Sequence, residues 1–374
     1  MLAVGRARAA TNAAVKVGLV GSEGPLAASI LRGAEFGTSE ADVFARLFGK
    51  RVELLVRTAA SEEETQAAGQ QLFSSERVAA VIGGATDGAA EALGKAAEQA
   101  SGLFLNVGAT SSRLREAPFS RRTFHVHPGL ATLVNAAGLW LLEQRRTRWG
   151  LVVAQSRFGS EVRAAASALA TRHSAQVLLR ENVGPSLGDW GAVLGRVRDA
   201  QVDAVFAGLE PDVMRAFLAS YRAAGLSCEL AALSSDPHFA LEAETAGLVG
   251  TWPLAWHQSL ERYSARELNG RFSRRFERAL DGAGWAAWAA VKLVAEAALR
   301  AESVEVERLL DFFERRVAFD GHKGAALSFR QADHELGQPL YIARPQPGAG
   351  GLEIVAEVSR ERLDAVATPQ QESR

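Results

Sequence analysis

Short apolar runs recur along the first two thirds of the chain, separated by longer segments in which apolar residues return every three or four positions. The runs are rich in Val, Leu and Ile, and they lack the polar alternation of a strand with one wet face, which is typical of parallel strands buried on both faces. They cover residues 15–21, 51–57, 78–84, 102–108, 149–155, 175–181, 203–209 and 229–235. Strand alternating with helix predicts a doubly wound α/β fold with parallel sheets.

A pause in this alternation divides the chain. Around residues 117–133 a proline-bounded apolar piece precedes a long helical segment and a second set of strands, which predicts a passage from one domain to another. The length of 374 residues agrees with two domains, because single cores stop growing at roughly 250–300 residues. After about residue 260 the pattern becomes helical, and the stretches 319–329 and 338–346 then predict a hairpin with a glycine-rich turn.

Composition narrows the class of protein. Lys and Arg number 42 against 43 Asp and Glu, so no long-range field favours nucleic acid or an anionic membrane as a partner. The single cysteine, Cys228, excludes an internal disulfide and leaves the compartment open. No apolar run approaches the roughly 20 residues of a membrane-spanning helix. The first residues contain two arginines without an apolar core, so we expect a signal peptide to be absent or already removed.

The sequence motifs of common enzymes are missing. No G-x-G-x-x-G follows the first strand, residues 88–96 do not match a phosphate-binding loop, and no G-x-S-x-G is present. His125 and His127 share one face of a short extended piece, and without clustered carboxylates nearby a cleft-lining role is favoured over a metal site. We therefore predict no metal, no cofactor and no enzymatic activity. In the less favoured reading as an α/β enzyme, His127 and Asp87 would form the acid–base pair.

The ends of the predicted strands carry small residues and hydroxyls instead. Ligands of open α/β sheets bind beyond the carboxyl ends of strands, where small residues allow close approach and helix amides act as donors. Several such ends without a nucleophile indicate binding rather than chemistry. The candidate ligand contacts at these ends are Ser22, Glu23, Thr86, Asp87, Gly108, Ala109 and Thr110, and His127 joins them as a residue lining the cleft.

Six segments in a fixed order resemble the periplasmic leucine/isoleucine/valine-binding proteins, the type I solute-binding components of ABC importers. They are residues 15–37, 78–93, 102–114, 152–166, 205–226 and 319–344. The resemblance implies two Rossmann-like lobes joined by three hinge crossings, with a small molecule held between them. It also implies a periplasmic or other extracytoplasmic monomer that works with the membrane subunits of an importer.

The resemblance also implies where the lobes divide. The first lobe is expected at residues 15–125 plus about 253–338, and the second at 126–252 plus about 339–360. Residues 1–14 and 361–374 are expected to be flexible ends.

The resemblance further assigns site residues. Gly108, Ala109 and Thr110 match the family's small-small-Thr stretch, whereas Asp87 stands where the family usually has a serine that donates to the ligand carboxylate. An ionised Asp87 would oppose that carboxylate, so either Asp87 turns away or the ligand is not a simple α-carboxylate. In the second lobe the candidates are Phe158, Leu209, Glu210 and Asp236, and two tryptophans near the second crossing, Trp252 and Trp256, add aromatic surface.

These residues favour an amino-acid-like ligand, or an apolar or aromatic compound with an amine or hydroxyl. A cytoplasmic ligand sensor of the same fold, similar to an amide receptor, is the alternative. A repressor of this fold is disfavoured, because fewer than 20 residues precede the first strand and cannot form a helix-turn-helix.

Overall fold

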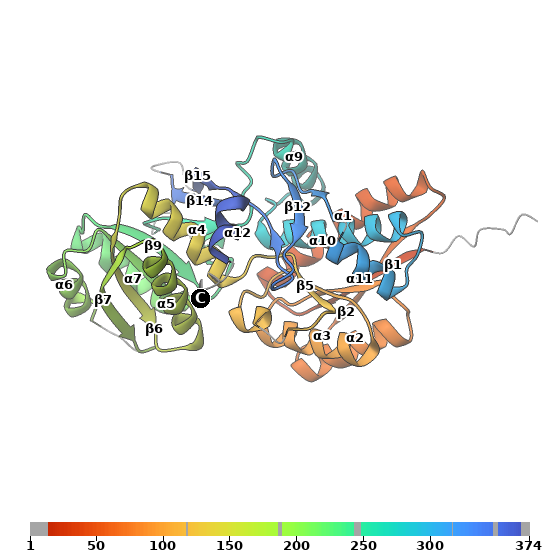
Figure 1. Cartoon of the computed structure of the whole chain (residues 1–374), viewed down its shortest axis with the longest axis horizontal. Coiled ribbons are helices and arrows are strands. Elements are labelled where there is room, and N and C mark those ends of the chain that lie inside the picture. Colours follow the sequence, from red (N-terminus) through yellow and green to blue (C-terminus); the bar gives the residue numbers. More distant parts are fainter. Residues whose placement is uncertain are drawn as a thin grey trace, which may run out of the picture.

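The computed structural model describes residues 14–116, 119–185, 189–242, 248–315, 317–346 and 351–367. These residues form two lobes side by side, each built on a parallel sheet flanked by helices (Figure 1). The predicted α/β class with two Rossmann-like lobes is confirmed.

The sheet of the first lobe has the strand order β2-β1-β3-β4-β5, and every neighbouring pair is parallel. Its strands are β1 (Val15–Gly21), β2 (Val52–Thr58), β3 (Ala80–Gly83), β4 (Phe104–Asn106) and β5 (Thr123–His125). Because β2 and β3 lie on opposite sides of β1, the strand order reverses there, and the loops after β1 and β3 diverge at a switch point of the kind that binds ligands in such sheets.

Helices cover both faces of this sheet. They are α1 (Pro25–Arg46), α2 (Glu62–Ser74), α3 (Asp87–Ala100), α9 (Ala265–Phe276), α10 (Gly282–Arg300) and α11 (Val306–Arg315), with a short 3-10 helix η1 (Ser112–Arg115) after β4. One apolar core packs α1 and α10 against the sheet, and a smaller core packs α2 and α3 on the other face. Helices α1 and α10 approach so closely that a Cβ added to Gly33 would lie 2.1 Å from the carbonyl oxygen of Gly284.

The second lobe repeats this architecture with the strand order β7-β6-β8-β9, again all parallel. The strands are β6 (Arg148–Ala154), β7 (Gln176–Val183), β8 (Ala204–Leu209) and β9 (Glu229–Ser234). The helices are α4 (Leu130–Glu143), α5 (Arg157–Arg172), α6 (Gly191–Asp199), α7 (Pro211–Ala224) and α8 (Phe239–Glu242). Two apolar cores lie on the two faces of this sheet, so β6, β8 and β9 are buried on both sides as their sequence predicts, whereas the edge strand β7 has exposed positions along its length.

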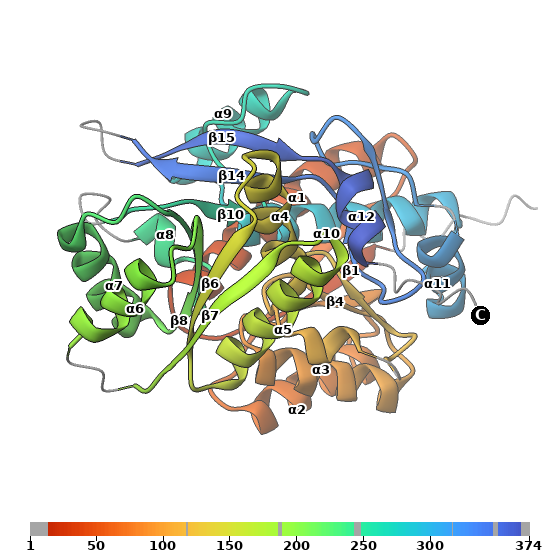
Figure 2. The same ribbon diagram turned by 60° about the vertical axis from the view of Figure 1, so that its left-hand side comes forward.

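An antiparallel layer lies beside the second sheet (Figure 2). It contains β10 (Trp252–Leu254), β14 (Leu340–Pro345) and β15 (Leu352–Val358), and α12 (Arg360–Ala367) follows it. In the first lobe, β12 (Ala326–Phe329) pairs with β11 (Phe319–Asp320) and β13 (Leu336–Gly337).

The glycine-rich turn that contains Gly321 and Gly324 closes a small hairpin of β11 and β12, but the predicted pairing of residues 319–329 with 338–346 is wrong. The second stretch crosses to the other lobe and pairs with β10 and β15, because local turn signals cannot specify a partner from a distant part of the chain. Helix α12 covers residues 360–367, so all but its first residue fall in the stretch 361–374 that was expected to be flexible. The remainder of both predicted ends, apart from residue 14, lies outside the described residues.

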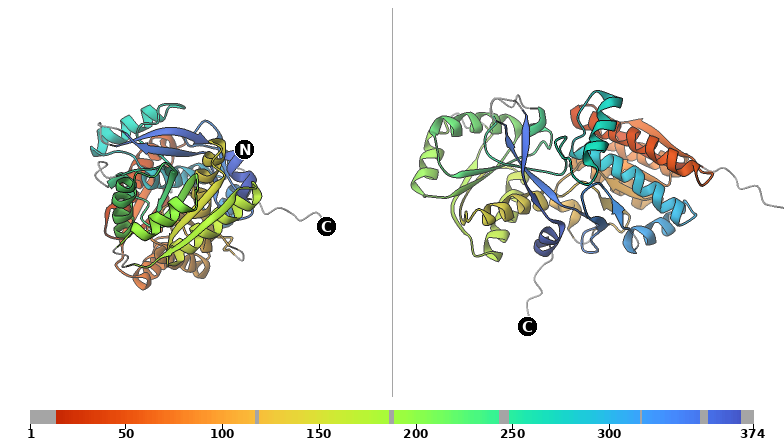
Figure 3. Two further views of the ribbon diagram at one scale, coloured as in Figure 1. Left: turned by 90° about the vertical axis from the view of Figure 1, so that its left-hand side faces the viewer. Right: turned by 90° about the horizontal axis from the view of Figure 1, so that it is seen from above.

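Three segments connect the lobes, after β5, after β10 and after β13 (Figure 3). Lys323 ties them together from a fully buried position: its ammonium donates to the carbonyl of Ala255 and to Oε1 of Gln338 at 2.7 Å. Gln338 in turn donates to the carbonyl of Val126 at 2.9 Å. Burial lowers the pKa of Lys323 well below its usual value, and its ammonium lies 4.2 Å from the centre of the Trp285 ring. The three crossings are thus joined by one buried polar network.

Candidate functional site

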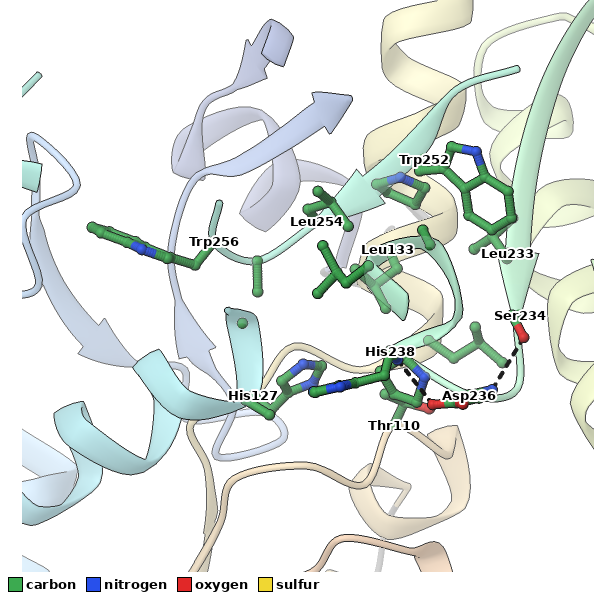
Figure 4. Close-up of a pocket in the computed structure, with 18 of the residues that line it drawn as sticks. Thr110, His127, Leu133, Leu233, Ser234, Asp236, His238, Trp252, Leu254 and Trp256 are labelled. Atoms are coloured by element: carbon green, nitrogen blue, oxygen red, sulfur yellow. Dashed lines mark hydrogen bonds between the residues drawn. The ribbon is translucent and has the colours of Figure 1, made fainter. Parts of the chain in front are cut away.

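A small cavity lies where the two lobes meet, and we call it the interlobe cavity (Figure 4). The first lobe contributes Thr110 and the start of α10, the crossing after β5 contributes His127, and the second lobe contributes α4, the loop after β9, α8 and β10. Its volume is about 60 Å³, room for roughly four to six water-sized groups at about 10–15 Å³ each. The interlobe cavity therefore matches a small ring or a short apolar chain.

Most of the wall is apolar. Its larger side chains come from α4, β9, α8 and β10, and they are Leu130, Leu133, Leu233, Leu241, Trp252 and Leu254. Trp252 is held by stacking on Phe239, with ring centres 5.6 Å apart, and its indole N–H donates to the carbonyl of Val249 at 3.3 Å. An apolar wall with a few convergent polar groups is typical of sites that bind small organic molecules.

The polar groups of the second lobe follow strand β9. The carboxylate of Asp236 accepts from the backbone N–H of His238 at 2.9 Å, and the hydroxyl of Ser234 accepts from the N–H of Asp236 at 3.2 Å (Figure 4). These two hydrogen bonds from backbone N–H groups to side chains hold the loop after β9 and place Asp236 and His238 at the wall of the interlobe cavity.

His127, on the first crossing between the lobes, provides a further polar group of the cavity wall. Its Nδ1 lies 3.0 Å from the carbonyl oxygen of Pro128. Burial, together with the positive charge of Arg115, lowers the pKa of His127 to about 4, so the ring is neutral at pH 7.

A buried ion network holds the segment that carries His127. The guanidinium of Arg115 donates to the carbonyl of His127 at 2.8 Å and to Glu335 at 2.7 Å. Glu335 also accepts from the N–H of Gly129 and the hydroxyl of Thr132, at the start of α4. Although burial alone would raise the pKa of Glu335, nearby arginines lower it to about 2. This network fixes the first crossing between the lobes.

Two direct contacts join the lobes beside the cavity. Glu161 of α5 accepts from the hydroxyl of Ser111 at 2.8 Å and from the N–H of Ser112 at 2.7 Å. On the other side, Nε2 of His238 lies 3.3 Å from Asp281, the residue that caps α10. Burial alone would raise the pKa of Asp281, but its contact with His238 contributes to holding it below its usual value. The structure is thus closed by side chains from both lobes.

Five of the fourteen predicted site residues line the interlobe cavity: Thr110, His127, Asp236, Trp252 and Trp256. The ring of Trp256 points away from the other labelled side chains in Figure 4. It is fully buried, and it stacks on Trp285 with ring centres 5.8 Å apart. Trp256 therefore serves mainly as packing between the second crossing and the core of the first lobe.

The candidates near Asp87 take part in contacts within the first lobe. The hydroxyl of Thr86 accepts from Ala89 N–H and caps α3, and Asp87 accepts from the N–H of Ser111 at 3.2 Å. The N–H groups of Gly108 and Ala109 both donate to the side chain of Asn106. The amides expected to face a ligand at residues 108 and 109 are thus occupied by a neighbouring side chain in this structure.

The remaining candidates lie away from the interlobe cavity. Ser22 and Glu23 are exposed after β1, and Phe158 is half-buried near the start of α5. Leu209 belongs to the buried core of the second lobe, and Glu210 immediately precedes α7. These assignments remain predictions.

Sequence reasoning missed three residues that join the lobes or shape the cavity. Glu161 lies within a plain amphipathic helix, so no local signal distinguishes it. His238 and Asp281 have weak signals, because His238 follows the Ser-Ser-Asp turn after β9 and Asp281 stands three residues before Gly284 at a helix start. Such positions predict a loop residue and a helix cap. The contact between His238 and Asp281 could not be predicted, because it depends on how the two lobes pack together.

Among the described residues no group of three or more His, Cys, Asp or Glu side chains is arranged to hold a metal ion. Within the same residues, every helix is too short or too polar to cross a bilayer.

Comparison with solved structures shows the same two-lobed fold. A branched-chain amino acid ABC transporter periplasmic ligand-binding protein from Burkholderia xenovorans LB400 has a TM-score of 0.83 at 14% identity, over 93% of this chain and 96% of that chain. An ABC transporter substrate-binding protein from Sphaerobacter thermophilus has a TM-score of 0.79 at 22% identity, over 93% and 98%. A solute-binding protein of an ABC transporter from R. palustris, in complex with 4-hydroxybenzoate, has a TM-score of 0.73 at 16% identity, over 93% and 96%.

The fold and the interlobe cavity define a two-lobed binding protein. The family model described as periplasmic binding protein matches residues 14–351. The chain therefore belongs to the periplasmic binding protein family, and the resemblance to the branched-chain amino acid binding proteins is confirmed. This is a family of ligand-binding proteins of ABC transporters rather than of enzymes. No curated protein matches the chain in sequence.

Proposed function

We propose that this chain is an extracytoplasmic solute-binding protein that captures one small molecule between its lobes and delivers it to an ABC importer. The observation that carries the proposal is the interlobe cavity, because its wall needs residues of both lobes. A ligand held there contacts both lobes only when they are closed, so it shifts the population toward the closed shape. The closed shape is then what the membrane subunits of the importer recognise.

The proposed ligand is amino-acid-like, or an apolar or aromatic compound with an amine or hydroxyl. The apolar wall suits such a body, and Thr110, His127 and Asp236 supply polar contacts around it. Similar structures are described as a ligand-binding protein of a branched-chain amino acid transporter and as a complex with 4-hydroxybenzoate. These two descriptions support an amino-acid-like ligand and an aromatic ligand with a hydroxyl, respectively.

We further propose that the protein acts as a monomer whose lobes move as units. The first unit comprises residues 15–125 and about 253–338, and the second comprises 126–252 and about 339–360. The buried network around Lys323 lies at the three crossings between these units, where a hinge is expected to keep its contacts during closure.

A thermal-shift screen over amino acids, amides, polyamines, aromatic acids and alcohols tests the binding function. A ligand at 100 times its Kd stabilises the folded state by about 2.7 kcal/mol, which raises Tm by a few degrees. The variant Leu133→Trp, which fills the interlobe cavity, is expected to lose that shift. Leu178→Trp, at a half-exposed position on β7 outside the cavity, serves as the matched control. Absence of any ligand from the whole screen would contradict the proposed function.

Closure is measured separately by small-angle X-ray scattering. Saturating ligand is expected to narrow the distribution of interlobe distances and reduce the radius of gyration, or to leave it unchanged where the free protein is already closed. Open particles that stay open with a tight ligand would exclude lobe closure as the mechanism.

Fractionation of cells that express the natural gene tests the proposed location.

A further inference from the structure

His127 and the first two residues of α10, Gly282 and Ala283, belong to the wall of the interlobe cavity. His127 has only 4% of its surface exposed. A Cβ built on Gly282 would lie 3.7 Å from Nε2 of His127, so this nitrogen faces the start of α10. Within the described residues the structure records no hydrogen-bond partner for this nitrogen, whereas Nδ1 lies 3.0 Å from the carbonyl oxygen of Pro128.

The contact of Nδ1 determines what Nε2 can do. A carbonyl oxygen only accepts, so the proton of the neutral ring is on Nδ1 and Nε2 is an acceptor. Burial and the charge of Arg115 lower the pKa of His127 to about 4, which keeps the ring neutral near pH 7. His127 therefore presents a lone pair at the wall of the cavity, where an O–H or N–H donor of a ligand can pair with it.

The start of α10 offers hydrogen-bond donors, which require an acceptor on the ligand. The first N–H groups of a helix have no acceptor within the helix. Asp281 accepts from the N–H of Gly284 at 2.8 Å, whereas no acceptor is recorded among the described residues for the N–H groups of Gly282 and Ala283. These donors lie at the positive end of a helix of 19 residues.

Only some ligand groups satisfy both sides. A carboxylate suits the helix N–H groups but opposes the lone pair of His127. An ammonium suits the lone pair but meets the positive end of the helix. Asp281, the nearest carboxylate at this helix end, already accepts from the hydroxyl of Ser29 and contacts His238. A hydroxyl both donates and accepts, so it matches the two sides together.

We propose, resting on the proposed function, that the ligand of the interlobe cavity carries a hydroxyl that donates to Nε2 of His127 and accepts from the first N–H groups of α10. The remainder of the ligand is apolar, because the rest of the wall is mainly leucine, alanine and tryptophan. The ligand class is thus an alcohol or a phenol with a small apolar body.

Three one-ring probes test this assignment. Phenol can donate and accept, anisole can only accept, and benzene can do neither. Phenol is expected to bind at least about tenfold more tightly than the other two, since leaving a buried acceptor unpaired weakens binding roughly 5- to 150-fold. Binding is measured from the chemical shifts of backbone amides that line the cavity. Equal affinity for the three probes, or no saturable binding of phenol, overturns the proposal.

Variants of His127 assign the effect to this residue. His127→Leu is expected to bind phenol and benzene equally, whereas His127→Gln keeps an acceptor oxygen and is expected to restore part of the preference. His173→Gln changes an exposed histidine in the second lobe and is expected to leave the preference intact. Persistence of the full preference in His127→Leu would assign it elsewhere and overturn the proposal.

The protonation of His127 is measured in the unaltered protein, first without a ligand and then with phenol. The ¹⁵N chemical shifts of its ring nitrogens are expected to show a neutral ring with the proton on Nδ1, and addition of phenol is expected to shift Nε2 in the direction of an accepted hydrogen bond. A proton on Nε2 at neutral pH overturns the proposal even where a ligand is found. Failure of the proposed function is distinguished from this outcome by the broad screen, which finds no ligand of any class in that case.

Discussion

The contact of Glu161 with the first lobe is expected to stabilise the closed arrangement of the two lobes. Glu161 lies on α5 of the second lobe, and it accepts hydrogen bonds from Ser111 and Ser112 of the first lobe. Both bonds exist only while the lobes touch. Replacing Glu161 with alanine therefore removes attraction from the closed state and leaves the open state unchanged.

The size of the effect follows from these two bonds. A hydrogen bond to a charged group contributes about 1.5–3 kcal/mol when buried, and exposed ionic contacts contribute at most about 1 kcal/mol. Glu161 is half-buried, so we expect about 2 kcal/mol for the pair of bonds. The ratio of closed to open molecules then falls roughly 30-fold.

Two consequences are measurable. Spin labels at Glu63→Cys on α2 and Ala168→Cys on α5, in a Cys228→Ser background, report the distance between the lobes, and the distance in ligand-free Glu161→Ala is expected to become longer and broader. The Kd for any ligand of the interlobe cavity is expected to rise by up to about 30-fold, since apparent affinity falls with the fraction of binding-competent molecules.

Arg163→Ala is the matched control on the same helix. Its side chain donates to Ser160 and Asn182, both within the second lobe, so neither the interlobe distance nor the Kd is expected to change. If Glu161→Ala keeps both the wild-type distance distribution and the wild-type Kd, the contact does not stabilise closure and the reasoning fails.

Three further predictions concern stability. Gly33→Val places carbon atoms against the backbone of Gly284, where a Cβ would lie 2.1 Å from the carbonyl oxygen. The variant is expected to lower the free energy of unfolding in urea by more than about 3 kcal/mol. A loss below about 1 kcal/mol would contradict the close contact between the two helices. Lys323→Met leaves three oxygens, including Oε1 of Gln338, without their donor. The variant is expected to lower Tm and to broaden the distribution of interlobe distances seen by X-ray scattering. An unchanged Tm would show that removing a buried charge offsets the lost hydrogen bonds. For His127 the folded pKa of about 4 lies below the ordinary 6.5, so the unfolded chain binds the proton first, and its contribution is lost as pH falls from about 6.5 to about 4. Wild type is therefore expected to lose about 3 kcal/mol more than His127→Gln over that range, and parallel pH profiles of the two proteins would refute the assignment.

Local patterns were sufficient for most of the fold. Val17, Val81 and Leu151 lie in continuous apolar runs, which identifies strands buried on both faces, and every one of the eight predicted runs contains a parallel strand. The partner of residues 338–346 was mispredicted because partner choice depends on residues outside the local window. Strand β15 (Leu352–Val358) was missed, because its exposed positions interrupt the apolar run.

The candidate site was less predictable. Thr110 was predicted from the small polar residues that follow a strand, and Asp236 from the family resemblance; both line the interlobe cavity. Asp87 carries the same signal, yet its carboxylate accepts from the N–H of Ser111. Glu161, His238 and Asp281 carry little local signal, since their role depends on a neighbour from the other lobe.

The sequence by itself determined the alternation of strand and helix, the division into two lobes and the family, because each depends on residues close together in the chain or on the order of segments. Only the tertiary structure decided which strand ends line the interlobe cavity, which amides are already occupied, and which nitrogen of His127 contacts a backbone carbonyl. These depend on distances between residues that are far apart in the chain, such as His127 and Gly282, or Glu161 and Ser111. Apolar periodicity fixes which face of an element is buried, but the packing of two lobes fixes what that face meets.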